Sequence, residues 1–199
     1  MNKIITISRE FGSGGREFGR RIAELLHCAY YDHEIIQELS KRTALAEEYI
    51  SRLDEHQTLP LMPITIGNSF SLFSNPLQEQ NSMVYAEQSK LIEEIATKSD
   101  CIIIGRCADF ILRNLHPYRI HLYSDMESKI QRCQSRAPAG ESISEKELQQ
   151  KIESINRQRA KYYQLSSGQN WSYPLNYDLC INTSNKDIKE ISTTFSKIL

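Results

Sequence analysis

The stretch "ITISREFGSGGREFGRRIAELL", residues 5–26, joins a β-branched apolar run to a cluster of glycines and then to a helical pattern. β-branched residues favour a strand, and glycines permit the backbone conformations of a tight turn. A helix that starts directly after such a turn presents its free amides and the positive end of its dipole to an anion. The stretch therefore predicts a phosphate-binding loop, although the lysine that such loops usually carry is missing.

The composition limits the classes of function. The 199 residues suffice for one well-buried core, alone or with a small appendage, so two independent domains are not expected. The 24 Lys and Arg side chains nearly balance the 25 Asp and Glu side chains, for a net charge of -1. We therefore expect no nucleic-acid partner and no membrane partner, and any anion site must be local. The five cysteines form no C-x-x-C pair, and no apolar run is long enough to span a bilayer, which indicates a cytoplasmic protein.

Strands alternate with helices along the chain, which is the pattern of a parallel sheet covered on both faces. We predict strands at residues 3–8, 29–31, 101–105, 119–123 and 177–181. We predict helices at residues 15–27, 33–43, 46–56, 83–98, 108–114, 126–136, 145–164 and 186–198. The predicted fold class is therefore α/β, a three-layer α/β/α arrangement with a five-stranded parallel sheet.

Two segments interrupt this alternation. Residues 59–77, "LPLMPITIGNSFSLFSNPL", contain three prolines and no clear apolar period, which predicts a loop or a small lid. Residues 137–144, "APAGESIS", break the chain before a long and strongly charged helix. We expect that helix to project from the body of the protein or to move on it.

The glycine cluster fits the Walker consensus G-x-x-x-x-G-K-S/T only in part. Gly14 can serve as the last glycine, but Gly15 occupies the place of the lysine and Arg16 the place of the hydroxyl. Arg9 stands where the first glycine is expected. The sequence therefore keeps the order of the motif, a strand followed by a glycine-rich turn and the start of a helix, but not its lysine and hydroxyl.

The dinucleotide consensus G-x-G-x-x-G is also incomplete. Gly12 and Gly14 match its first two glycines, whereas Glu17 replaces the third. Asp32 lies at a suitable distance along the chain for a ribose contact. A third interpretation is a tight β-to-α turn that needs glycines for its backbone alone.

Several further segments resemble the cytidylate kinase-like proteins, a branch of the nucleoside monophosphate kinases. They are "ISREFGSGGREFG", "YYDHEII", "CIIIGRCADFIL", "HLYSDMESKIQRCQSR", "INRQRAKYY" and "YDLCINTS", in that order. The resemblance implies a P-loop kinase-like fold with strand order 2-3-1-4-5. It also implies one such domain over residues 1–199, with a flap at about 55–82 and a helical, arginine-bearing lid at about 137–170.

By the same resemblance, the donor-phosphate loop consists of Gly12, Ser13, Gly14, Gly15 and Arg16. Arg16 is the natural replacement for the absent lysine, because a guanidinium binds phosphate bidentately and stays charged at any working pH. The alternative is a solvated arginine in the first turn of a helix.

The acceptor side of the site is predicted at the ends of two strands. Asp32 closes the second strand, where these kinases place an acid near the acceptor nucleotide, and it is also a good helix N-cap. Arg106 follows the central strand, at the edge where ligands bind in open α/β sheets. Cytidylate kinases have an acid where Cys107 stands, and Asp109 is the candidate to replace it.

The segment "ESINRQRAKYYQ" resembles a kinase lid, whose arginines close over the phosphoryl group in transfer. Arg157 and Arg159 are the candidate catalytic residues, with Lys161 beside them. Residues two apart point to different sides of a helix, so at most two of the three can reach one phosphate. The alternative is a solvated amphipathic helix. Arg132 and Arg136 form a basic face and are secondary candidates.

The leading hypothesis is an ATP- and Mg²⁺-dependent phosphotransferase whose partner is a small-molecule nucleotide such as a nucleoside monophosphate. Magnesium would be held by waters, by the nucleotide and by an acid such as Asp32 or Asp109, and no zinc site is predicted. The alternative is a protein that binds nucleotide or phosphate without catalysis, and a Rossmann-type oxidoreductase comes third. Homo-oligomerisation stays an open alternative. Trp171 is expected to anchor a loop.

Overall fold

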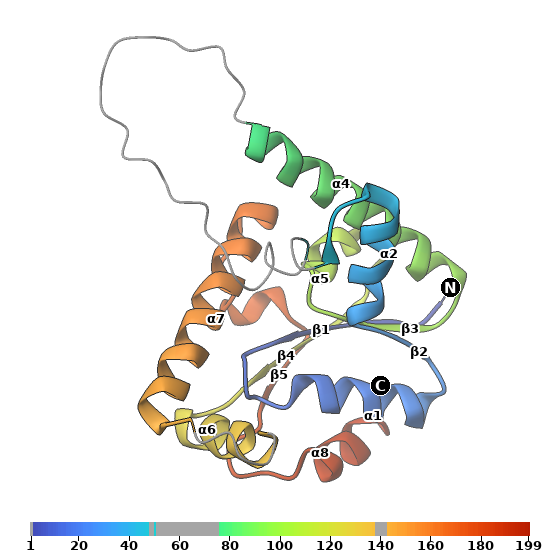
Figure 1. The fold of residues 1–199 in the computed structure, drawn as a ribbon. Coiled ribbons are helices and arrows are strands. Elements are labelled where there is room, and N and C mark those ends of the chain that lie inside the picture. The colour runs from blue at the N-terminus through green and yellow to red at the C-terminus, as the bar shows by residue number, and fades with distance from the viewer. Residues whose placement is uncertain (1, 48–49, 51–75, 138–142) are drawn as a thin grey trace, which may run out of the picture.

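A computed structural model describes residues 2–47, 50, 76–137 and 143–199 (Figure 1). Five parallel strands form one sheet: β1 (Ile4–Arg9), β2 (Ala29–Tyr31), β3 (Cys101–Ile104), β4 (Tyr118–Tyr123) and β5 (Leu179–Asn182). Their order is β2-β3-β1-β4-β5, so the predicted fold class and strand order are confirmed.

The sheet is covered on both faces by helices. They are α1 (Gly15–Leu26), α2 (His33–Thr43), α4 (Pro76–Lys98), α5 (Ala108–Ile111), α6 (Met126–Ser135), α7 (Glu145–Ser167) and α8 (Ile188–Phe195). Short 3₁₀ helices cover Arg113–Leu115 and Pro174–Asn176. No helix in these described segments is both long enough and apolar enough to cross a membrane.

Alternate residues of the central strands face opposite halves of the core. Ile102 and Ile104 of β3 pack with α1 and α8, whereas Cys101 and Ile103 pack with α2 and α4. All four side chains are at most 1 % exposed. A continuous apolar run on a strand is the pattern expected when both faces of a parallel sheet are covered.

Some predicted boundaries differ from the structure. Helix α4 begins at Pro76, seven residues before its predicted start, because proline is well suited to a first helical position. The predicted loop at 59–77 therefore overlaps α4 at its end, and the rest of it lies outside the described residues. The same holds for most of the predicted helix at 46–56. Helix α5 is shorter than predicted, since Arg113–Leu115 form a 3₁₀ turn instead.

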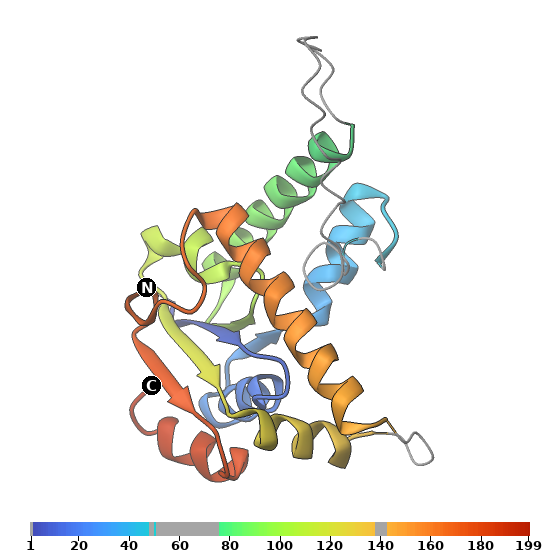
Figure 2. The ribbon, with the colours of Figure 1, turned by 90° about the vertical axis from the view of Figure 1, so that its left-hand side faces the viewer.

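The long helix α7 is defined at both ends by local signals. Ser144 and Glu147 form a capping box at its start, and Gly168, with a positive φ of 72°, ends it. Figures 1 and 2 show α7 running along the side of the sheet toward which β1 and β4 point. This course places α7 beside the loop that follows β1.

A buried polar network fixes the segment after α7 to the sheet. The Trp171 indole N–H and the Tyr177 hydroxyl lie 2.7 and 3.3 Å from Ser8 Oγ, and His121 Nδ1 lies 3.1 Å from the same oxygen. The His121 ring stacks on Tyr177 and meets Trp171 edge-on. Trp171 therefore anchors a loop, as its sequence context predicts.

His121 should make the protein sensitive to acid. Burial lowers the pKa of His121 to about 4 from its ordinary 6.5, so the unfolded chain binds the proton first as the pH falls. The stability that depends on neutral His121 is present above pH 6.5 and is lost between pH 6.5 and 4, by up to about 3 kcal/mol. Urea unfolding at a series of pH values measures this slope. The His121→Gln variant should lose much of it, and an unchanged slope would assign the acid sensitivity to other groups.

Candidate functional site

The loop between β1 and α1 has a backbone that only glycine accommodates at two positions. Gly12 and Gly14 have φ angles of 79° and 83°, in the left-handed region. A Cβ on Gly12 would lie 2.9 Å from Lys129 Cβ, and one on Gly14 would lie 2.6 Å from Ile188 Cδ1. The glycines thus permit both the turn and its close packing against α6 and α8.

The loop leaves the first amides of α1 available. The earliest backbone hydrogen bond at this end runs from the Phe18 N–H to the Gly14 carbonyl. The N–H groups of Gly15, Arg16 and Glu17 have no hydrogen-bond acceptor among the described residues. Unpaired amides at the start of a twelve-residue helix, together with its dipole, favour an anion.

A cavity of about 330 Å³ lies at this end of α1, where Gly14, Gly15 and Arg16 line it. Most of its described polar lining is cationic: Arg9, Arg16, Arg132, Arg136, Lys151 and Arg159. Glu10 is the one carboxylate among the described residues that line it. Since the whole chain is nearly neutral, these cations are a local concentration of positive charge, which favours an anion.

Glu10, the acid in the described lining of the cavity, forms a structural pair. Glu10 Oε2 lies 2.7 Å from Lys129 Nζ and accepts the Ser124 N–H at 3.1 Å. The Lys129 side chain is only 8 % exposed. This pair ties the loop to α6 and reduces the negative charge that Glu10 presents to the cavity.

The two secondary candidates, Arg132 on α6 and Arg136 directly after it, also reach the loop. Arg132 donates hydrogen bonds to the carbonyls of Gly12 and Thr183, and Arg136 pairs with Glu17 in the first turn of α1. Both arginines line the cavity. The predicted basic face therefore holds the loop in place and adds positive charge beside it.

The predicted acceptor acid lies next to the loop. Asp32 Oδ2 lies 2.8 Å from Arg16 Nε, and Asp32 Oδ1 lies 3.8 Å from Arg9 Nη2. The Arg16 side chain is 60 % exposed and that of Asp32 is 15 % exposed. Asp32 therefore lies beside the cavity, because it contacts two arginines that line it.

The other two predicted acceptor residues lie deeper. Arg106 is 6 % exposed, and its carbonyl accepts a hydrogen bond from Gln88 Nε2. Asp109 accepts a hydrogen bond from the Tyr163 hydroxyl at 2.7 Å, and burial raises the pKa of its carboxyl group. Neither residue is part of the described lining of the cavity. The structure thus gathers the loop residues, Asp32 and the α6 arginines, but not Arg106 and Asp109.

The two candidate lid arginines point in different directions. Arg159 lines the cavity and donates a hydrogen bond from Nη1 to the Arg9 carbonyl at 3.0 Å. The Arg157 side chain is 71 % exposed and lies 3.5 Å from Glu153. Asn156 accepts the Phe11 N–H at 2.7 Å, so α7 contacts the loop at two points.

Among the polar residues that line the cavity or contact its loop, Arg9, Glu10, Lys151 and Asn156 were not predicted. Asn156 could have been found, because it lies three positions before Arg159 and therefore shares its helix face. Lys151 lies two turns before Arg159 on the same helix. Arg9 was counted only as a departure from the Walker consensus, and its direction in space could not be read from the motif.

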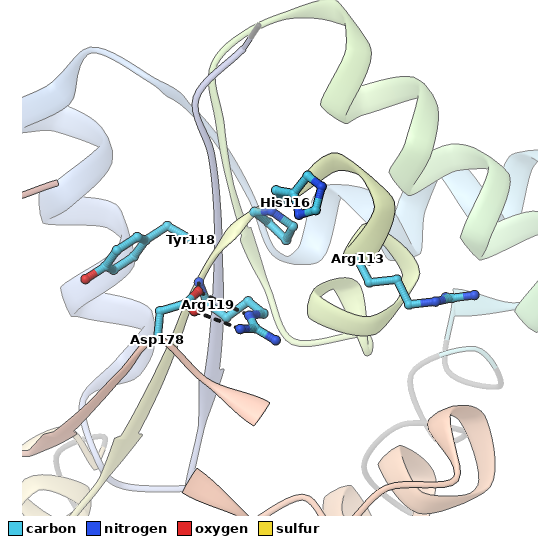
Figure 3. A pocket seen from close by; sticks show the side chains of 6 residues that line it. Arg113, His116, Tyr118, Arg119 and Asp178 are labelled. Atoms are coloured by element: carbon cyan, nitrogen blue, oxygen red, sulfur yellow. Dashed lines mark hydrogen bonds and ion pairs between the residues drawn. The ribbon is translucent and has the colours of Figure 1, made fainter. Parts of the chain in front are cut away.

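A second cavity, of about 320 Å³, lies at the opposite end of the sheet (Figure 3). It is lined by Arg113, His116, Pro117, Tyr118, Arg119 and Asp178, at the start of β4. The Arg119 guanidinium donates two hydrogen bonds to Asp178, of 2.7 and 3.1 Å, and the Arg119 backbone N–H donates a third of 2.8 Å, which joins β4 to the segment before β5. Ligands of open α/β sheets bind at the carboxyl ends of the strands, so we assign this cavity no role in the site.

Comparison with known proteins assigns the chain to a family. Residues 4–185 match the family described as the cytidylate kinase-like family, and the chain belongs to that family. No curated protein sequence matches the chain significantly.

The fold recurs in solved structures. An uncharacterized protein from Eubacterium ventriosum ATCC 27560 is 22 % identical with a TM-score of 0.71, over 99 % of this chain and 98 % of that one. Shikimate kinase from Acinetobacter baumannii, in complex with shikimate, is 13 % identical with a TM-score of 0.53, over 100 % and 93 % of the two chains. A gluconokinase from Sinorhizobium meliloti 1021 is 13 % identical with a TM-score of 0.53, over 96 % and 87 %. At these identities the likeness concerns the fold.

Removing Glu10 should destabilise the protein more than removing Lys129, because Lys129 is the more deeply buried partner of the pair. Glu10→Ala leaves the charge of the nearly buried Lys129 without its carboxylate, so the free energy of unfolding should fall by about 3 kcal/mol. Lys129→Met fills a similar volume and leaves Glu10 its Ser124 N–H and partial exposure, so it should cost clearly less. Urea unfolding at neutral pH compares the two. A larger loss for Lys129→Met would contradict the assignment.

Proposed function

We propose that this protein is an ATP-dependent phosphotransferase that acts on a nucleoside monophosphate or a similar small acceptor. The observation that carries the proposal is the cavity at the start of α1, which six cationic side chains line together with the first residues of that helix, whose amides have no acceptor among the described residues. A triphosphate is the small ligand whose charge and length suit such a surface. Membership of the cytidylate kinase-like family supports the same class of reaction.

The donor phosphates would lie on the loop between β1 and α1. The Gly15, Arg16 and Glu17 amides would bind non-bridging oxygens, and Arg16 would exchange its contact with Asp32 for a contact with phosphate. In the reaction, the bond between the γ-phosphorus and the oxygen shared with ADP breaks, and that oxygen keeps the electron pair. A new phosphorus–oxygen bond forms to the acceptor oxygen. Such a transfer depends mainly on positioning and on neutralisation of charge.

A magnesium ion would have few protein ligands in this site. The described residues contain no group of three or more His, Cys, Asp or Glu side chains that could hold a metal, and Asp32 is already engaged by Arg16 and Arg9. We therefore propose that the nucleotide oxygens and waters hold the ion, as magnesium prefers. When bound, the ion would neutralise part of the phosphate charge.

Of the two candidate lid arginines, we propose Arg159 as the one that acts on the phosphoryl group. It lines the cavity, and its link to the Arg9 carbonyl holds α7 on the loop. Arg157 faces solvent in this structure, so a role for it requires α7 to move. Asp32 is the residue that we propose next to the acceptor. Arg106 and Asp109 are buried, so they would stabilise the acceptor site without contacting the cavity.

The alternative function is nucleotide or phosphate binding without transfer. It is favoured by Gly15 and Arg16 at the positions of the Walker lysine and hydroxyl, and by the engagement of Asp32 with two arginines. This alternative predicts the same affinity for ATP but no turnover, so an activity measurement separates the two.

Turnover tests the proposal directly. ADP release from ATP and Mg²⁺ should be stimulated by at least one member of a panel of nucleoside monophosphates. Arg159→Lys should lower kcat more than it weakens ATP binding, on the order of a hundredfold, because a contact specific to the transition state appears in the rate. Arg157→Lys, at the exposed position, is the matched comparison and should have a much smaller effect. ATP binding without transfer to any acceptor would replace the phosphotransferase with the binding protein.

A further inference from the structure

Arg9 is the last residue of β1 and stands where the Walker consensus has its first glycine. It is 7 % exposed, yet it lines the cavity in front of α1. Its Nη2 atom lies 3.8 Å from Asp32 Oδ1, at the end of β2. The side chain therefore starts behind the loop and runs across the carboxyl ends of β3 and β2.

Two glycines make room for this course. A Cβ on Gly15 would lie 2.5 Å from Arg9 Cβ and 2.8 Å from Arg9 Cγ. A Cβ on Gly105, after β3, would lie 1.8 Å from Arg9 Nη1. The stem of Arg9 thus fills the space beside the first residue of α1, and its guanidinium group rests on the turn after β3.

One of these glycines, Gly15, is the residue at the position of the Walker lysine. A lysine there would need a Cβ in space that the Arg9 stem occupies. Compared with the consensus, the cation and the glycine have therefore changed places: position 9 has an arginine instead of a glycine, and position 15 has a glycine instead of a lysine. The two departures from the consensus depend on one another sterically.

We propose that Arg9 contacts the terminal phosphate of the donor and takes the place of the Walker lysine from the opposite side of the loop. The inference rests on the proposed function and adds the residue that recognises the transferred group. An arginine suits the position because its planar guanidinium binds two oxygens at once and keeps its charge when buried.

Arg9 suits this role better than Arg16. The Arg16 side chain is 60 % exposed and must be ordered when phosphate binds, whereas Arg9 is already held by Gly105 and Asp32. A positioned charge stabilises a transition state without the cost of reorganisation. Asp32 contacts both guanidinium groups, so one carboxylate holds Arg9 and Arg16 at the same edge of the site.

The contact also links the phosphate to the lid. The Arg9 carbonyl accepts the hydrogen bond from Arg159, so both arginines move with the same residue of β1. If the Arg9 backbone shifts when phosphate binds, this hydrogen bond would therefore transmit the shift to Arg159 and α7.

The discriminating measurement is the affinity for ATP relative to ADP, by calorimetry with Mg²⁺. If Arg9 contacts the terminal phosphate, Arg9→Gln should weaken ATP binding by roughly tenfold to a hundredfold. It should change ADP binding by less than about threefold, since ADP lacks the group that Arg9 would contact. Arg9→Lys, which keeps the charge and most of the stem, should retain part of the preference for ATP. Arg20→Gln is the matched control, because Arg20 is an exposed arginine of α1 that pairs with Glu24.

A reciprocal exchange tests the steric relation. Arg9→Gly should lose the preference for ATP, and Gly15→Lys alone should be destabilised by the clash with the Arg9 stem. The double variant, Arg9→Gly with Gly15→Lys, restores the first glycine and the lysine of the Walker consensus and should recover the preference at least tenfold over Arg9→Gly. A double variant no better than Arg9→Gly would overturn the inference.

The outcomes distinguish the inference from the function on which it rests. A wild-type protein that binds neither ATP nor ADP overturns the proposed function and the inference with it. A wild-type protein that binds ATP, with Arg9→Gln weakening ATP and ADP equally, overturns only the inference and leaves Arg9 a structural residue.

Discussion

The site depends on one backbone constraint, the left-handed turn that carries the chain from β1 into α1. Gly12 and Gly14 adopt φ angles that other residues reach only with strain, and both pack against neighbouring helices without a Cβ. The turn orients the first amides of α1 toward the carboxyl edge of the sheet. Every other feature of the site, from the arginines of α6 to the contacts of α7, is arranged around those amides.

Charge is the second level of organisation. A chain with a net charge of -1 concentrates six cations around one cavity and commits the only described carboxylate of that cavity to Lys129. Several of the cations also have structural tasks, since Arg132 holds the loop and Arg159 holds α7. The same hydrogen bonds that stabilise the fold therefore fix the positions of the charges, which is what electrostatic preorganisation requires.

The alternation of apolar strands and helices predicted the α/β fold class, because it is a strong local pattern. The strand order came from the resemblance to the cytidylate kinase-like proteins, and the structure confirms it. The glycine cluster predicted the turn between β1 and α1, and helix geometry predicted that Arg157 and Arg159 would point to different sides. The depth of Asp109 could not be predicted, since it depends on the Tyr163 hydroxyl of a distant helix. The direction of Arg9 depends on the absence of a Cβ at Gly15 and Gly105, which no local pattern reveals. Spatial relations of this kind arise only in the folded chain.

The central claim is that the α1 amides bind the phosphates of a nucleotide. Hydrogen exchange of the backbone amides at residues 12–17, with and without saturating ATP and Mg²⁺, tests it most directly. A bound phosphate would accept hydrogen bonds from these N–H groups, so we predict that their exchange slows markedly while the amides around Arg119 and Asp178 are unaffected. Binding of ATP that leaves the exchange at residues 12–17 unchanged would contradict the account.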